Sequence, residues 1–410
     1  MNHLWRKRAA VCFLVLALLG TLAFGCGKAK KEEKVTITIG QITDMTGPAS
    51  PATKPVTWAI EDIVRYLNEE DPIPGVKLRV VTYDCMYNPA RDIPGFEWCI
   101  ERGAKVIYTP MPTTASTLKF FAEEDKVPVV IPTAGQDALE PPGWVFAWYP
   151  SASSLIKTVV KFVEEQWTNY PTKIKIGCAG WVEPHNADVE KGVREYAQAH
   201  PDKFEYVGGF LTSMGTMTWA GEIRKLKECD YICVPSTGMA TGSFIKEARS
   251  AGYTGGFIQT DSVTGFTALI LAMSGWEAVD GLLTGGCAMW WSETAPIVEL
   301  TKEILHRYHS SADAEATIAS GTGYCNGFQH SLIWFEAVRE AVKKVGAENF
   351  DGQAFYDTIK NFTYKSKYEG YPEVSFIDST RSAMNHIRIY EWSASARDLV
   401  SVSDWIPAVD

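Results

Sequence analysis

The sequence predicts an α/β protein of two lobes, each a doubly wound parallel sheet. Short runs rich in β-branched residues alternate with helical segments along most of the chain. This alternation begins again after Pro150, and 410 residues are enough for two domains that each bury a core. Strand–helix alternation at this pitch is typical of parallel sheets with helices on both faces.

The first series of elements begins at Val35 and ends before Pro150. Its expected strands are 35–42, 76–83, 106–108 and 127–131, and its expected helices are 55–67, 92–102 and 114–124. Because ligands of such open sheets gather beyond the carboxyl ends of the strands, the loops that follow these strands are candidate binding loops.

The second series follows Pro150. Its expected strands are 174–178, 206–211, 231–234 and 257–259, and its expected helices are 154–167, 188–199, 220–228 and 242–251. The tail is less regular, with helices expected at 297–308, 327–345 and 355–362 and a strand at 386–392. Two similar open sheets in one chain predict a cleft between them.

The N-terminus has the features of an export signal. Arg6, Lys7 and Arg8 precede an apolar run at 9–24, and the sequence LAFGC, which ends at Cys26, resembles a bacterial lipobox. We therefore expect 1–25 to be a lipoprotein signal peptide, Cys26 to be lipidated, and the Lys- and Glu-rich segment 26–34 to be a solvated tether. A permanent transmembrane anchor is the alternative, and either places the body outside the cytoplasm, on the periplasmic or extracellular face of a membrane.

Composition narrows the possible partners. The chain is 46% hydrophobic and 21% charged, with a formal net charge of −10, which suits a globular protein. It has no basic tract, so nucleic acid is not an expected partner.

Cysteine usage predicts neither a disulfide framework nor a metal site. Nine cysteines become seven once Cys12 and Cys26 are set aside, and an odd, scattered set is a poor framework. Cys85 and Cys99 fit either a disulfide or two core thiols. We expect no metal, since Cys229 and Cys233 lack two further ligands nearby, and no cofactor, since the sequence has no P-loop or dinucleotide-binding fingerprint.

Four segments together resemble a known family, the leucine/isoleucine/valine-type periplasmic binding proteins, which are type I solute-binding proteins of ATP-driven (ABC) importers. The segments are IGQ…TGP at 39–48, VIYT…TTA at 106–115, VVIPTA at 129–134 and ARSAG at 248–252. The resemblance runs from about Val35 to Trp392. It implies interleaved lobes joined by a three-segment hinge, 35–150 plus 281–352 and 151–280 plus 353–410, with crossings near Pro150, near Asp280 and after about Gly352.

In the first lobe, two loops are candidate binding loops. Thr113 and Thr114 follow a strand and open a helix, so their hydroxyl and N–H groups would receive a carboxylate, although simple N-capping explains them too. The resemblance implies further contacts from Thr133, Ala134 and Gly135. Gly135 stands where the family more usually has a hydroxyl residue.

In the second lobe, the resemblance implies contacts from His185, Ser236, Thr237 and Asp261. His185 lies at the family's Tyr-Gly turn, and a surface or core imidazole is the alternative. Asp261 lies where relatives place an acid that pairs with the ligand's ammonium group, and a helix N-cap is the alternative. Trp148, Trp181 and Phe266 lie near predicted loops and could stack on an aromatic acid or amide instead, and a place in the core is the alternative for each.

The expected function is that of an extracytoplasmic receptor that delivers a small organic ligand, an amino acid or analogue, to the permease subunits of an ABC importer. The lipid anchor would hold it at the membrane. The alternative is an extracellular sensor for aromatic acids, amides or urea-like compounds. Catalysis is not expected, because the G-x-C-x-G match around Cys325 lacks the strand-to-helix context of a nucleophile elbow.

Overall fold

The computed structural model describes residues 34–236, 238–377 and 381–409. The predicted signal peptide, the lipidation site Cys26 and the tether up to residue 33 lie outside the described residues, as does Thr237. Residues 36–410 form one compact unit. Within the described part of the chain, no helix is long and apolar enough to cross a membrane.

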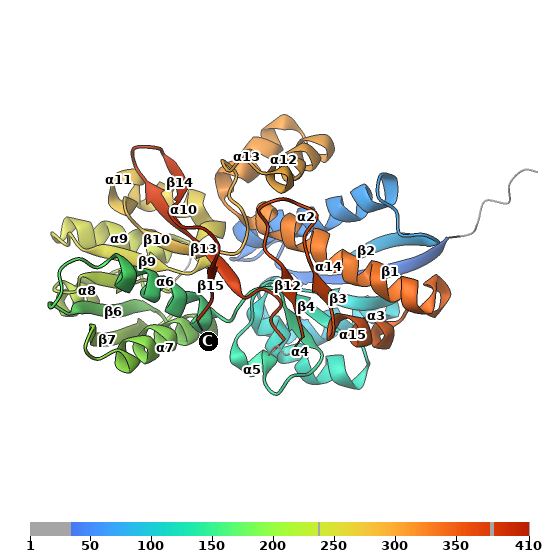
Figure 1. The fold of residues 1–410 in the computed structure, drawn as a ribbon, viewed down its shortest axis with the longest axis horizontal. Helices are drawn as coiled ribbons and strands as arrows, with labels where there is room; N and C mark the ends of the chain where they lie inside the picture. Colours follow the sequence, from blue (N-terminus) through green and yellow to red (C-terminus); the bar gives the residue numbers. More distant parts are fainter. Residues whose placement is uncertain (1–33, 237, 378–380, 410) are drawn as a thin grey trace, which may run out of the picture. The chain divides into compact units, whose positions relative to one another are not determined.

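The first sheet has the strand order β2-β1-β3-β4-β5, and Figure 1 labels β1 to β4. Its strands are β1 (Val35–Thr43), β2 (Val76–Asp84), β3 (Ala104–Tyr108), β4 (Val129–Ile131) and β5 (Val145–Ala147). β1 pairs with β3, β3 with β4 and β4 with β5, all in parallel. The last strand was not predicted, because three apolar residues after a Pro-Pro-Gly turn carry little periodic signal.

Helices cover both faces of the first sheet because its strand residues alternate between two cores. Val106 and Tyr108 belong to the core beneath α2 (Ser50–Glu69) and α14 (Gly323–Val345), whereas Ile107 belongs to the core beneath α3 (Asp92–Glu101) and α4 (Pro112–Glu124). α2 and α14 pack closely at Gly327, where an added Cβ would lie 3.0 Å from the Ala59 Cβ atom.

The second sheet has the order β14-β13-β10-β9-β8-β6-β7, and β15 also pairs with β13. Its strands are β6 (Ile174–Trp181), β7 (Phe204–Thr212), β8 (Tyr231–Cys233), β9 (Gly256–Gln259), β10 (Leu283–Gly286), β13 (His386–Ser393), β14 (Asp398–Ser401) and β15 (Ile406–Pro407). The pairings from β7 to β10 are parallel, but β13 is antiparallel to its partners. This lobe is therefore a parallel sheet with an antiparallel edge.

Helices also cover the second sheet. α6 (Ala152–Gln166) and α7 (Pro184–Ala199) pack against each other and against the sheet, and α8 (Ala220–Leu226) and α9 (Met239–Ser250) also contact it. The remaining elements are η1 (Pro89–Arg91), α5 (Gln136–Leu139), η2 (Asp261–Phe266), α10 (Thr267–Ser274), α11 (Trp276–Val279), α12 (Pro296–Tyr308), α13 (Ser311–Ser320), η3 (Ala347–Asn349), α15 (Gly352–Ile359), β11 (Thr363–Tyr364) and β12 (Val374–Ser375).

Two of the expected lobe boundaries differ from the sheet membership. Residues 283–286 were assigned to the first lobe but form β10 of the second sheet, so the crossing expected near Asp280 follows β10. Residues 352–359 form α15, which packs on α14 and β3 of the first lobe, although 353–410 was assigned to the second. Both boundaries were placed wrongly for the same reason. The local sequence of a short strand such as β10 or a short helix such as α15 does not indicate which of two lobes it packs in.

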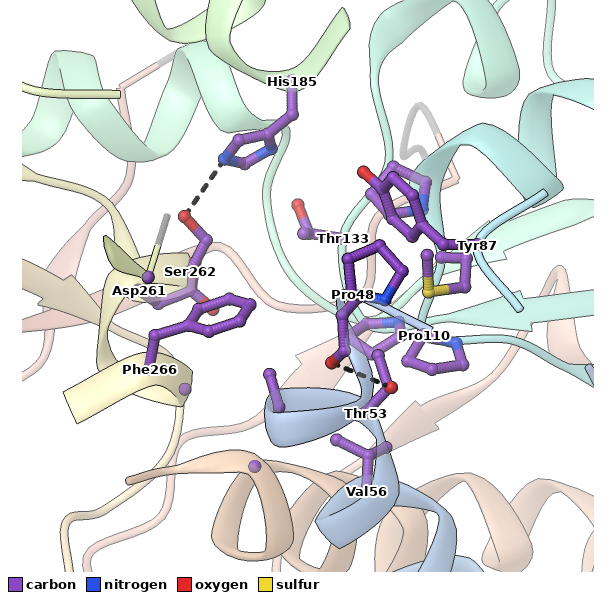
Figure 2. A pocket seen from close by; sticks show the side chains of 18 of the residues that line it. Pro48, Thr53, Val56, Tyr87, Pro110, Thr133, His185, Asp261, Ser262 and Phe266 are labelled. Carbon is purple, nitrogen blue, oxygen red and sulfur yellow. Dashed lines mark hydrogen bonds between the residues drawn. The ribbon is translucent and has the colours of Figure 1, made fainter. Parts of the chain in front are cut away.

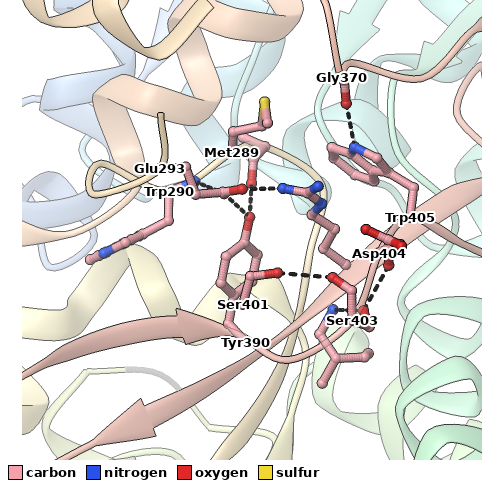
Figure 3. Close-up of polar contacts among 12 residues, drawn as sticks. Met289, Trp290, Glu293, Gly370, Tyr390, Ser401, Ser403, Asp404 and Trp405 are labelled. Atoms are coloured by element: carbon pink, nitrogen blue, oxygen red, sulfur yellow. Dashed lines mark hydrogen bonds and ion pairs between the residues drawn. The ribbon is translucent and has the colours of Figure 1, made fainter. Parts of the chain in front are cut away.

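The segments between the lobes meet around Glu293 (Figure 3). This carboxylate pairs with Arg388 and accepts hydrogen bonds from the Tyr390 hydroxyl and from the backbone N–H of Trp290. Gln329 of α14 bonds the backbone N–H and C=O of Met289 at 2.8 and 2.9 Å. The segment after β10 is thereby fixed to both α14 and β13.

Candidate functional site

A cavity of about 350 Å³ lies between residues of the two lobes. This volume is within the range of small-molecule sites. Figure 2 shows His185, Ser262 and Phe266 on one side and Pro48, Pro110 and Tyr87 on the other. Most of the lining is apolar, and it includes the side chains of prolines, methionines and aromatic residues: Pro48, Pro110, Pro112, Pro132, Pro184, Met111, Met214, Met239, Tyr87, Trp181 and Phe266.

The first-lobe wall is formed by the turn after β1 and the start of α2. Asp44 holds this turn, because its carboxylate accepts hydrogen bonds from the backbone N–H groups of Gly47 and Ala49 at 2.5 and 2.8 Å. Asp84 accepts from Met45 N–H and the Thr46 hydroxyl at 3.0 and 2.6 Å. These hydrogen bonds hold the TGP turn in place and so fix the position of the first turn of α2, which lines the cavity.

The N-terminus of α4 reaches the same wall. Pro112 is its first residue and has no N–H, so the first free N–H groups belong to Thr113 and Thr114. Thr113 lines the cavity, and its hydroxyl has no partner among the described residues. Thr114 is buried, and its hydroxyl donates to Asp92 at 3.0 Å, so this side chain points away from the cavity.

The second-lobe wall is formed by residues that follow β6 and β9. The Ser236 hydroxyl accepts the Trp181 backbone N–H at 2.7 Å, and the Trp181 indole N–H donates to the Thr216 carbonyl at 2.7 Å. Ser236 is thus a buried support for the Trp181 loop and does not line the cavity. The resemblance had implied a ligand contact there.

Asp261 is the most unusual polar group of the lining. It is only 5% exposed, and its Oδ1 atom has no hydrogen-bond partner among the described residues. Burial raises the pKa of its carboxyl to about 7. It opens η2 without capping it through its side chain, since Thr260 holds the N-cap position. A buried carboxylate without a partner is costly, so this atom is a strong candidate for a ligand contact.

Two imidazoles line the cavity and both are neutral at pH 7. His185 Nε2 lies 3.2 Å from the Ser262 hydroxyl, and burial lowers the pKa of His185 to about 4. His330 of α14 is held between two phenols, with Nε2 3.1 Å from the Tyr108 hydroxyl and Nδ1 3.0 Å from the Tyr149 hydroxyl. Burial lowers the pKa of His330 to about 3. Neither side chain supplies a positive charge.

Four of the predicted site residues line the cavity: Thr113, Thr133, His185 and Asp261. The Thr133 hydroxyl already donates to the Pro150 carbonyl at 3.0 Å, so its proton is not available to a ligand. Ala134 and Gly135 do not line the cavity, and neither do Thr114 and Ser236. Thr237 lies outside the described residues.

Several lining residues were not predicted. Glu183 and Ser262 are each close in sequence to a predicted residue, and their polar side chains were a usable signal. The start of α14 contributes Thr322, Asn326 and His330, which are distant in sequence and were missed because only packing against α2 brings them to the cavity. Tyr87 follows β2, and its hydroxyl donates to Glu183 at 3.5 Å across the cavity.

The residues considered for other chemistry are accounted for by packing. Cys325 lies within α14, and its thiol donates to the Met289 carbonyl at 2.9 Å, so it is not at a strand-to-helix turn. Burial raises the pKa of this thiol far above its ordinary value. Cys85 and Cys99 are buried and separate thiols. No group of three metal-ligating side chains occurs among the residues that the structure describes.

Several solved structures are similar to this chain. A branched-chain amino acid ABC transporter protein from Thermus thermophilus with bound valine has a TM-score of 0.77 and 20% identity, and the match covers 92% of this chain and 97% of that one. A fatty acid ABC transporter substrate-binding protein from Thermomonospora curvata has a TM-score of 0.76 and 15% identity, covering 91% and 93%. A solute-binding protein from Rhodopseudomonas palustris in complex with p-hydroxybenzoic acid has a TM-score of 0.75 and 16% identity, covering 92% and 98%.

None of the curated protein sequences matches the chain significantly. At these identities the similar structures show the fold, with its two lobes of largely parallel sheet. The family assignment comes from the sequence, because the model of the periplasmic binding protein family matches residues 36–397. The chain therefore belongs to the periplasmic binding protein family, and its fold is that of the type I substrate-binding proteins of ABC transporters.

Proposed function

We propose that this protein captures a small organic ligand outside the cytoplasm and delivers it to the permease subunits of an ABC importer, and that the ligand is an amino acid or a close analogue with an apolar body. The observation that carries the proposal is the unpartnered, buried carboxyl oxygen of Asp261 in an otherwise largely apolar cavity. A ligand ammonium group would supply the missing charge and hydrogen-bond donor.

The rest of the cavity supports an apolar body on that ligand. The rings of Tyr87, Trp181 and Phe266 line the cavity, and in the described part of the chain none of them stacks on another ring. Met111, Met214 and Met239 add flexible apolar surface that adapts to different shapes. Closure of two lobes over such a ligand would bury it and present a distinct surface to the transporter.

An aromatic acid is the second candidate, because three aromatic side chains line the cavity. The similar protein from Rhodopseudomonas palustris was crystallised with p-hydroxybenzoic acid. Delivery to a sensor protein in place of a transporter is a further alternative, but no feature of the cavity favours it.

A thermal-shift screen of amino acids, aromatic acids, amides and urea at pH 8 tests the ligand class. A ligand that binds only the folded state raises the melting temperature, by an amount that grows with its concentration above Kd. We expect shifts from compounds with an amino group, and loss of those shifts in Asp261→Asn. A strong shift from an uncharged or anionic compound that persists in this variant would refute ammonium pairing.

The proposal includes a lipid anchor at Cys26. Cys26→Ala should leave the protein exported but released from the membrane, because stable attachment needs the acyl chains. Fractionation of cells that produce the two forms measures this. A variant that remains in the membrane fraction would mean that the apolar run at 9–24 is a transmembrane anchor.

A further inference from the structure

We infer that the cavity takes an organic amine that has an apolar body and no carboxylate. The inference rests on the proposed function, and it narrows "amino acid or close analogue" to the analogue without the acid group. It follows from the charged groups in and behind the cavity wall and from the aromatic rings that face it.

The charges of the lining have one sign. Among the described residues that line the cavity, Asp261 and Glu183 are acidic and none is a lysine or an arginine. Both imidazoles are uncharged at neutral pH, as described above. A ligand carboxylate would therefore meet two acidic groups and no cationic side chain, whereas an amine would be attracted by both acidic groups.

The N-terminus of α4, where an amino acid's carboxylate would be expected to bind, lies next to the acidic residue Asp92. The N-terminus of α4 should attract an anion through its free N–H groups and dipole. However, Asp92 is buried beside its first turn, where it accepts the Thr114 hydroxyl at 3.0 Å. Its second oxygen, Oδ2, has no partner among the described residues. The negative charge of Asp92 thus partly offsets the positive end of the α4 dipole and would repel a ligand carboxylate at Thr113.

The aromatic residues of the lining also favour a cation. The faces of aromatic rings attract ammonium groups within about 6 Å, most strongly where water is excluded. In the described structure, neither lysine nor arginine lies over the rings of Tyr87, Trp181 or Phe266, although such pairs occur elsewhere, as between Arg102 and Trp98. These rings therefore remain available to a ligand cation.

Isothermal titration calorimetry with matched compounds tests the inference. Each amine is compared with the amino acid that differs from it by one carboxylate and with the acid that lacks the amino group. The series are isoamylamine, leucine and isocaproate; phenethylamine, phenylalanine and hydrocinnamate; and tryptamine, tryptophan and indolepropionate. The titrations use the purified protein at pH 8, where Asp261 and Asp92 are ionised.

In at least one series we expect the amine to bind ten-fold or more tightly than its amino acid, and the acid not to bind. Asp261→Asn should abolish amine binding. Asp92→Asn keeps an acceptor for the Thr114 hydroxyl but removes the charge, so it should reduce the preference for the amine by about 3- to 10-fold. Melting temperatures of both variants confirm that they fold.

The possible failures are distinguishable. If an amino acid binds as tightly as its amine or more tightly, the inference is wrong and the proposed function stands. The same holds if amino acids bind and no amine does. If only the acids bind, both the inference and the ammonium pairing of the proposed function are wrong.

Discussion

Two carboxylates, that of Asp261 buried in the cavity and that of Glu293 half-buried between the lobes, have opposite surroundings. The carboxylate of Glu293 pairs with Arg388 and accepts hydrogen bonds from the Tyr390 hydroxyl and the Trp290 backbone N–H. Asp261 keeps one oxygen, Oδ1, that has no hydrogen-bond partner among the residues that the structure describes. The two carboxylates therefore have different roles. The paired carboxylate of Glu293 stabilises the chain around it, whereas the Oδ1 atom of Asp261 can accept a hydrogen bond from a ligand.

The pattern extends to a third carboxylate. Asp62 of α2 is 1% exposed, and it is bonded by His309 Nε2 at 2.7 Å and by the Tyr324 hydroxyl at 2.9 Å. It lies outside the cavity lining and joins α2 to α12 and α14. Asp62 is therefore a buried carboxylate of the first lobe that serves the fold and is paired.

The largest expected effect is on stability, from loss of the paired carboxylate. Glu293→Ala leaves the largely buried guanidinium of Arg388 without its partner, which should lower the free energy of unfolding by about 3 kcal/mol. Urea denaturation at pH 7 measures this. Glu165→Ala is the matched control, because its ion pair with Lys161 is exposed and should contribute at most about 0.5 kcal/mol. Equal effects of the two substitutions would contradict the comparison.

Loss of the unpaired carboxylate should have the opposite sign. Asp261→Asn removes a buried charge that has no ion-pair partner among the described residues, so the ligand-free protein at pH 8 should gain about 1–2 kcal/mol of stability while ligand binding is lost. Asp62→Asn serves as the control and should destabilise, because it weakens the bonds from His309 and Tyr324. A destabilised Asp261→Asn variant would show that this carboxyl has a structural role.

The pH dependence of the free energy of unfolding also tests whether the Asp261 carboxylate is costly to bury. The pKa of Asp261 is raised from its ordinary value near 4 to about 7 in the folded protein, so its protonation contributes stability that is fully present below about pH 4 and is lost as pH rises to 7. The stability gain of Asp261→Asn over the wild type should therefore grow across this interval and level off above it. Urea denaturation of both proteins between pH 4 and 8 measures the difference, and a constant difference would rule out titration of Asp261.

Ligand affinity, in contrast to stability, should increase as pH rises and Asp261 loses its proton. A cationic ligand needs the ionised carboxylate, whose population rises about ten-fold between pH 6 and pH 8 for a pKa near 7. Affinity should rise by a similar factor, measured by calorimetry in buffers of constant ionic strength. An affinity that is independent of pH in this interval would mean that Asp261 does not pair with the ligand's charge.

The smallest expected effect distinguishes two adjacent threonines. Thr113→Val removes a hydroxyl from the cavity and should weaken ligand binding by about 3- to 10-fold with little change in stability. Thr114→Val leaves Asp92 without its hydrogen bond, so it should cost about 1–2 kcal/mol of stability and change affinity less than two-fold. Calorimetry and urea denaturation of the pair measure both quantities. A reversal of the two results would mean that the binding residue is Thr114.

The sequence by itself determined the two-lobe α/β architecture, because alternation of strand and helix is written in local periodicity. Four of the candidate residues line the cavity, namely Thr113, which was predicted from its place between a strand and a helix, and Thr133, His185 and Asp261, which the family resemblance implied; their contacts with a ligand stay predictions. These four residues follow strands or open helices, and the edge at which parallel strands end is the same for every strand.

Only the tertiary structure decided which side chains face the cavity and which are committed elsewhere. Neighbours such as Thr113 and Thr114 are equivalent in the sequence, but a hydrogen bond to Asp92, twenty-two residues away, turns one of them inward. The contribution of α14 depended on its packing with α2 across more than 250 residues, and local periodicity carries no information about such a contact. The charge balance of the cavity depends on these long-range placements, so it too became visible only in the folded chain.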